Sequence, residues 1–151
     1  MVDEVSVPRS GARVLESFFA SAPLTTHPAV RARLPRVRSH LLTYLDTEGE
    51  VWLTPDELVL VCAEREIEPQ DAVVRVTGPE VLVAALPGFC HPAWLLPDHG
   101  DARAQVRVVA GLRAWLAEHG GLSRQASLHL LPRVDEAVRR AHTALDGSPA
   151  P

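Results

Sequence analysis

The chain has 151 residues, of which 46% are apolar and 23% charged, so it is long enough for one domain with a substantial core. Its net charge of −4 argues against a chain-wide nucleic-acid surface, and its basic residues are all arginine, as expected from a GC-rich genome. Two cysteines, Cys62 and Cys90, are too few for a disulfide scaffold. With neither a signal-peptide pattern at Met1–Glu4 nor a membrane-length apolar run, we expect a soluble cytoplasmic protein without a membrane partner.

The N-terminal third predicts a tail over residues 1–9 followed by two or three helices. Ser10 is placed to cap a short helix with one apolar patch, formed by Val14, Leu15, Phe18 and Phe19. Residues 28–46 carry a longer apolar stripe, formed by Val30, Leu34, Val37, Leu41, Tyr44 and Leu45. Pro35 interrupts this stripe, and because an interior proline costs about 3 kcal/mol, we expect either a kink or two separate helices.

The middle of the chain is harder to assign. Thr54-Pro55-Asp56-Glu57 predicts a helix start, because threonine caps, proline suits the first turn and glutamate completes a capping box. We expect this helix to bury one face, formed by Leu58, Val59, Cys62, Ala63 and Ile67. Residues 57–66 are also rich in β-prone side chains, and residues 72–76 suit a strand as well as a helix. A small β element is therefore an alternative within residues 50–76.

Residues 79–86 predict a short helix that starts at Gly78-Pro79. The next stretch, residues 87–98, contains three prolines in twelve residues, which excludes regular structure. Because this stretch also carries large apolar side chains, we expect an extended loop that is either packed over the core or exposed as a binding element.

Two amphipathic helices complete the chain. The first is predicted over Asp98–Gly121, with Asp98 and Asp101 favouring its N-terminus and Gly120-Gly121 its end. The second is predicted over residues 123–145, before a tail at 147–151. We therefore expect a single domain over residues 10–146, mostly α, folded as an irregular or orthogonal bundle of five to seven helices.

One short segment resembles a known family. Residues 72–88, with spaced apolar side chains around Gly78 and Gly88, resemble the strand–turn–helix that ends the core of sterol-carrier-type lipid-binding domains. The resemblance covers under an eighth of the chain. It implies a strand over residues 72–76, and it assigns no site residue.

Motifs for metal binding and catalysis are weak. Cys90, His91 and His99 are the one cluster of soft ligands, and they lack the C-x-x-C and H-E-x-x-H spacings of zinc sites. The chain has no nucleophile elbow, and without lysine it has no phosphate-binding P-loop. We expect no cofactor and no metal, and we lean against an enzyme.

The predicted 28–46 helix carries a basic cluster formed by Arg31, Arg33, Arg36, Arg38 and His40. No acidic residue interrupts it, and guanidinium groups in such a cluster suit phosphate contacts. The alternative is a solvated helix face, whose arginine stems cover apolar edges and whose charges pair with carboxylates elsewhere.

A second candidate site combines the Pro-rich loop with a nearby amide: Phe89, Trp94, Leu95, Leu96 and Gln105. If the loop is exposed, these apolar side chains form a partner site. Gln105 falls inside the apolar stripe of the 98–121 helix, so it needs hydrogen-bond partners, which the loop backbone can supply.

Three functions remain open at this point. We favour a non-catalytic interaction or regulatory module that binds a protein partner or self-associates as a homodimer. The first alternative is a DNA-binding regulator that uses the arginine cluster. The second is a small-molecule or lipid-binding domain, with its ligand between residues 78–86, the Pro-rich loop and Gln105.

Overall fold

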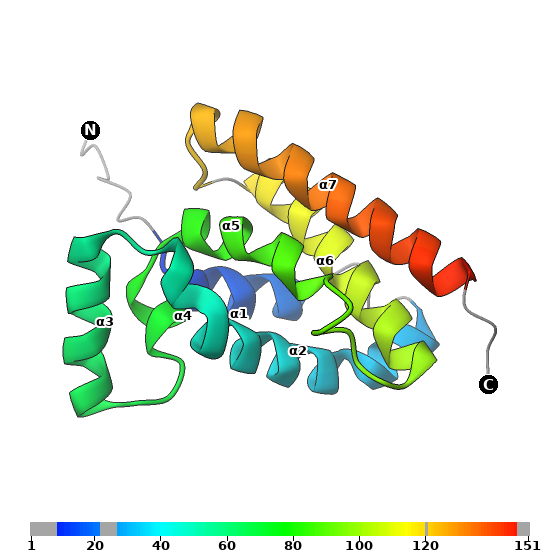
Figure 1. The fold of residues 1–151 in the computed structure, drawn as a ribbon, viewed down its shortest axis with the longest axis horizontal. Coiled ribbons are helices and arrows are strands. Elements are labelled where there is room, and N and C mark those ends of the chain that lie inside the picture. The colour runs from blue at the N-terminus through cyan, green and yellow to red at the C-terminus, as the bar shows by residue number, and fades with distance from the viewer. Residues whose placement is uncertain (1–8, 22–26, 120, 148–151) are drawn as a thin grey trace.

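The computed structural model describes residues 9–21, 27–119 and 121–147. These residues form seven α-helices and a 3₁₀ turn, and none of them lies in a strand. The helices pack as an irregular bundle (Figure 1), which confirms the predicted fold class. The predicted tails fall almost entirely outside the described residues.

The first two helices bury the apolar stripes that the sequence predicts. Ser10 caps α1 (Gly11–Ser21) by accepting the Arg13 backbone N–H at 3.2 Å. α2 (Pro28–Glu48) runs through Pro35 as one helix, so the alternative of two helices is wrong. Pro35 lies on the exposed side of α2. Because proline has no N–H, one carbonyl of the preceding turn lacks its helical donor, and on this side water can donate to it instead.

A 3₁₀ turn, η2 (Gly49–Trp52), leads into α3 (Pro55–Ile67). The predicted capping box is present: the Glu57 N–H donates to the Thr54 hydroxyl at 3.2 Å, and the Thr54 N–H donates to the Glu57 carboxylate at 2.9 Å. The strand alternative for residues 57–66 is therefore wrong.

The predicted buried face of α3 is also wrong. Its members are all exposed in the structure: Leu58, Val59, Cys62, Ala63 and Ile67. α3 turns the opposite side inward and fully buries Val61, which packs with Ala72, Val73 and Val81 in a small cluster apart from the main core.

Residues 72–76 form a short helix, α4 (Ala72–Val76), and not a strand. Its side chains Ala72, Val73 and Val74 are buried, and no strand among the described residues is available to pair with it. Burial thus overrides the β preference of valine. The strand implied by the resemblance to sterol-carrier-type domains is absent at this position.

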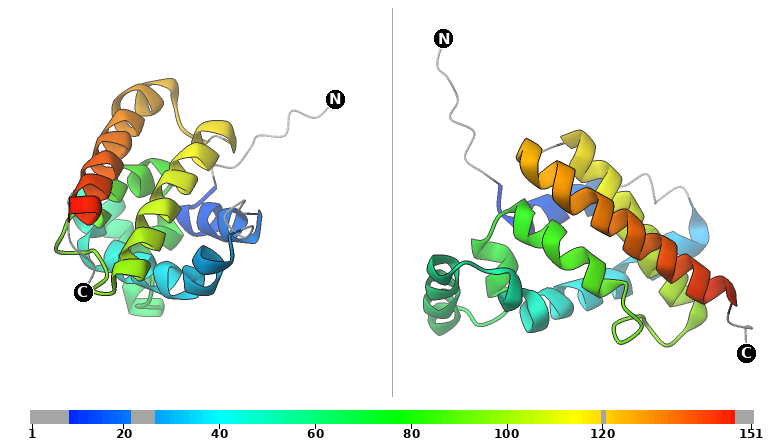
Figure 2. Two further views of the ribbon diagram at one scale, coloured as in Figure 1. Left: turned by 90° about the vertical axis from the view of Figure 1, so that its right-hand side faces the viewer. Right: turned by 45° about the horizontal axis from the view of Figure 1, so that its top comes forward.

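The central helix is α5 (Pro79–Phe89), which is buried on most of its surface. It starts at Pro79 as predicted and extends through Pro87 to Phe89, beyond the predicted end at residue 86. Helices α1, α2 and α7 and the η2 turn pack around it (Figure 2). Gly88 is needed here, because a larger side chain would clash with the Tyr44 hydroxyl, which donates to the Ala85 carbonyl at 2.6 Å.

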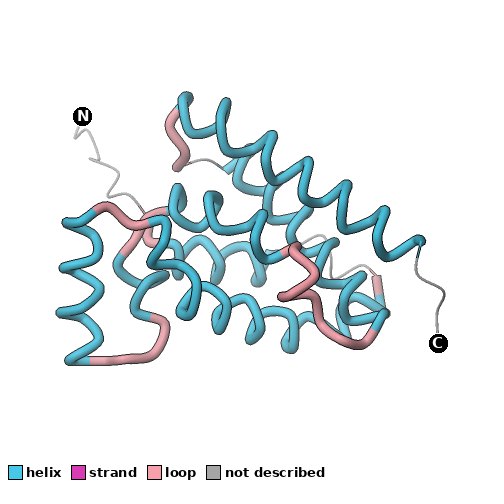
Figure 3. The backbone as a smooth tube through the Cα atoms, viewed as in Figure 1, coloured by secondary structure: helices cyan, strands magenta, loops and turns pink. Residues whose placement is uncertain are grey.

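α6 (His99–His119) and α7 (Arg124–Gly147) run antiparallel against each other (Figure 1). Gly121, which follows α6, has a positive φ of 87°, as a helix-ending glycine requires. Residues 90–98, which we call the strap, connect α5 to α6 without a helix (Figure 3). None of the described helices is both long and apolar enough to cross a bilayer.

Candidate functional site

The strap is closed over the bundle. Phe89, at the end of α5, is fully buried, and Trp94, Leu95 and Leu96 are half-buried against the main core. The Trp94 ring meets the Tyr44 ring edge to face, with 4.9 Å between centroids. The structure thus brings four of the five residues of the loop site together as core packing.

Gln105, the fifth residue, holds the strap in place from α6. Its side-chain amide donates to the Phe89 carbonyl at 3.0 Å and to the Trp94 carbonyl at 2.9 Å. Its side-chain oxygen accepts the Leu96 N–H at 2.9 Å. Both donors and the acceptor of this fully buried amide are therefore satisfied by the strap and the end of α5.

At the place predicted for a small ligand, between residues 78–86, the strap and Gln105, the Gln105 side chain is fully buried and its polar atoms bond protein backbone. A half-open groove of about 520 Å³ lies instead on another side of the strap, where α7 forms the opposite wall. Its apolar lining includes Pro87, Leu95 and Ala141.

Two arginines of the basic cluster bond carboxylates at the start of α6. Arg33 donates to Asp98 at 2.8 Å and to Asp101 at 2.6 Å, and Arg36 donates to Asp101 at 2.6 Å. Gly100 permits this contact, because a larger side chain there would clash with the Arg33 guanidinium. The Asp101 side chain is only 5% exposed. Its bonds to Arg33 and Arg36 join α2 to the N-terminus of α6.

The ion pairs shift the pKa values of both carboxyl groups. The hydrogen bond from Arg36 is the largest cause that lowers the pKa of Asp101, and Arg33 lowers it further. The pKa of Asp98 is lowered chiefly by the backbone N–H of Asp101, which it accepts at 2.9 Å, and then by Arg33. The charge of these two arginines is therefore largely compensated within the fold.

The other members of the basic cluster have different surroundings. Arg31 and Arg38 are exposed, and neither has an ion-pair partner within the described part of the chain. Arg38 lies over the Phe19 ring, 5.5 Å from its centroid. His40 belongs to the strap contacts, since its Nε2 lies 2.7 Å from the Trp94 carbonyl oxygen.

An apolar surface that the sequence analysis does not predict lies on η2 and α3. Seven large apolar side chains are exposed among the described residues, and six of them fall within residues 51–67: Val51, Trp52, Leu58, Val59, Leu60 and Ile67. α3 stands at one end of the molecule beside α4 (Figures 1 and 2). We use the name α3 face for its outward side chains, which are Val59, Leu60, Cys62, Ala63 and Ile67.

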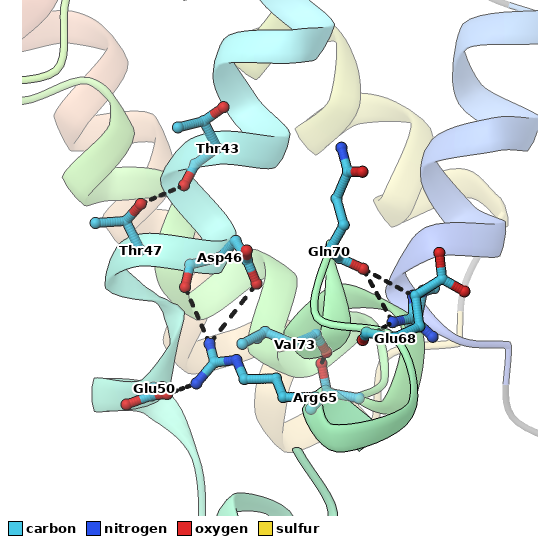
Figure 4. A network of polar contacts seen from close by, with 10 residues as sticks. Thr43, Asp46, Thr47, Glu50, Arg65, Glu68, Gln70 and Val73 are labelled. Atoms are coloured by element: carbon cyan, nitrogen blue, oxygen red, sulfur yellow. Dashed lines mark hydrogen bonds and ion pairs between the residues drawn. The ribbon is translucent and has the colours of Figure 1, made fainter. Parts of the chain in front are cut away.

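α3 is attached to the bundle from its other side. Polar contacts add to the burial of Val61: Arg65 reaches Glu50 and lies 3.6 Å from the Asp46 carboxylate (Figure 4). Glu64 pairs with Arg75 of α4. These contacts fix which side of α3 meets the bundle, and they leave the α3 face uncovered.

We predict that Gln105→Ala lowers the free energy of unfolding by about 3 kcal/mol, because it leaves strap backbone groups without partners and removes packing. The variant Gln105→Met, which has a side chain of similar size, should lower the free energy of unfolding by most of the same amount. It restores the packing but not the hydrogen bonds. Urea unfolding monitored by circular dichroism measures both variants. A Met variant as stable as the parent would show that the hydrogen bonds contribute nothing.

We predict that Asp101→Asn lowers the free energy of unfolding by about 2 kcal/mol at pH 7, because two charge-assisted bonds are weakened. A carboxyl whose folded pKa is lowered stabilises the fold above its unfolded pKa, and this stabilisation is lost as pH falls through the folded pKa. The difference between parent and variant should therefore shrink below about pH 4.

Urea unfolding at several pH values measures this difference. The control is Asp146→Asn, which removes an exposed pair with Arg103 and should cost under about 0.5 kcal/mol. If the free energy of unfolding of Asp101→Asn lies as far below that of the parent at pH 2 as at pH 7, the ion-pair explanation is contradicted.

The nucleic-acid alternative uses the α2 cluster, so it is limited by the number of arginines in that cluster that are unpaired. Each neutralised phosphate contributes about −0.9 to the slope of log K against log salt for duplex DNA. With Arg31 and Arg38 unpaired, we predict a slope no steeper than about −2 in fluorescence anisotropy titrations. A slope near −4 that Arg33→Ala and Arg36→Ala reduce would instead show that the α6 ion pairs open on DNA.

The side chains of the described residues include no group of three or more His, Cys, Asp or Glu placed to hold a metal ion. Cys90 is buried, and burial raises the pKa of its thiol to about 12. Comparison with protein-family models, with curated proteins and with solved structures finds no match to this chain.

Proposed function

We propose that the protein is a non-catalytic cytoplasmic interaction module that binds a protein partner through the α3 face. One observation carries this proposal: the exposed large apolar side chains of the described chain are concentrated on η2 and α3. Val59, Leu60 and Ile67 are 68%, 58% and 83% exposed on one helix. Contiguous apolar surface of this kind is uncommon on monomers and marks interaction sites.

The free energy available from this surface is moderate. Covering Val59, Leu60 and Ile67 would contribute about 4 kcal/mol of hydrophobic free energy. Association costs at least about 4 kcal/mol in lost translational and rotational freedom. Contacts beyond the helix, such as those that Val51 and Trp52 offer, are therefore needed for stable binding.

The other two candidate sites support a partner less well. The polar groups of the strap already bond Gln105 and His40. Two of the four arginines in the α2 cluster, Arg33 and Arg36, already bond the Asp101 carboxylate of α6. The α3 face, by contrast, has no internal partner among the described residues.

Cys62 provides a direct test, because it lies on the α3 face and is exposed whereas Cys90 is buried with a raised pKa. A thiol-reactive photo-crosslinker will label Cys62 selectively. We predict that irradiation in an extract of the source cells yields a discrete adduct at Cys62, and that Leu60→Gln with Ile67→Gln abolishes it. Both residues are exposed, so the substitutions should change stability by less than about 1 kcal/mol.

The matched control is Leu128→Gln on α7, an equally apolar side chain that is 64% exposed away from α3. This variant should form the adduct as the parent does. Adducts that survive the double substitution, or that Leu128→Gln removes as well, would contradict a docking role for the α3 face.

A further inference from the structure

We propose that the occupant of the α3 face is an amphipathic helix of another protein, with basic residues at the two ends of its apolar stripe. This inference rests on the proposed function and names the partner chemistry. It follows from the shape of the face, from the charges around it and from the consequence of pairing it with itself.

The shape of the α3 face suits a helix. At 100° per residue its five members span about 160°, and Val61 lies opposite their centre. Val59, Ala63 and Ile67 are spaced i, i+4 and i+8, which is the ridge that a second helix packs against. The small Ala63 side chain in the middle of this ridge allows the partner backbone to approach closely.

The charge around the face is uniformly negative. Asp56 and Glu66 are exposed and fall within the same arc as the apolar side chains, one toward each end of α3. They are ten residues apart, which is about 15 Å along the helix. The one basic residue between positions 48 and 74 is Arg65, and it is paired with Glu50 and Asp46 on the attached side.

These charges select among the occupants that an apolar face could have. A second copy would form a symmetric pair, in which the acidic ends of the two faces meet whether the helices run parallel or antiparallel. Anionic membranes and nucleic acids would be repelled for the same reason. A helix with Arg or Lys about ten residues apart would place its charges beside Asp56 and Glu66 and its apolar stripe on the face.

The test uses the full chain with an environment-sensitive fluorophore on Cys62, whose emission reports coverage of the α3 face. Two synthetic helical peptides share a Leu/Ile stripe and carry either Arg or Glu at two positions ten residues apart. We expect the Arg peptide to bind about tenfold more tightly at low salt. This preference should shrink as salt is raised to 0.5 M, because exposed charge pairs are screened.

Charge-neutralising variants locate the effect. Asp56→Asn with Glu66→Gln should remove the preference for the Arg peptide without weakening the Glu peptide. The control, Glu16→Gln with Glu118→Gln, makes the same change in net charge at exposed positions of α1 and α6 and should keep the preference. Leu60→Gln with Ile67→Gln should weaken both peptides, which separates the apolar contribution from the charges.

Four results would overturn the inference. The first is equal binding of the two peptides, and the second is no emission change with either. The third is a concentration-dependent emission change accompanied by a dimer in light scattering, which would assign the face to a second copy. The fourth is an emission change with anionic lipid vesicles. Equal binding of the two peptides that still requires Leu60 and Ile67 would overturn this inference and leave the proposed function standing. A Cys62 adduct that does not depend on Leu60 and Ile67 would contradict both the proposed function and this inference.

Discussion

The rest of the structure depends on the burial of α5. This helix is apolar on most of its surface, so it is stable only when other helices enclose it. α1, α2 and α7 each place one apolar stripe against it, and the strap that follows it is held by Gln105 of α6. The charged pairs between α2 and α6, at Arg33 and Asp101, lie outside this core and orient helices that hydrophobic burial has already brought together.

Features that depend on neighbouring residues were predictable from the sequence. The capping box at Thr54, the proline start of α5 and the stripe of α6 all result from interactions within a few residues, and all appear in the structure. The need of Gln105 for backbone partners was predictable too, because a polar group in an apolar stripe has to be satisfied. Its three bonds to the strap and α5 fulfil that expectation.

Features that depend on distant residues were not predictable. Residues 58–61 are apolar on both sides of α3, so local periodicity cannot decide which side is buried. The choice is made by Val61, which fits the α4 cluster, and by Arg65, which reaches Asp46 and Glu50. The partners of Arg33 and Arg36 were not predictable for a similar reason, because the carboxylate that they share lies more than sixty positions away in sequence.

The central claim is that α3 is attached to the bundle from one side and does not belong to its cooperative core. Native-state hydrogen exchange, followed amide by amide at increasing denaturant, tests this most directly. We predict that α3 amides exchange through a local opening with a free energy clearly below that of the α5 amides. If the amides of both helices exchange with the same free energy, by global unfolding, α3 is part of the core and the claim is contradicted.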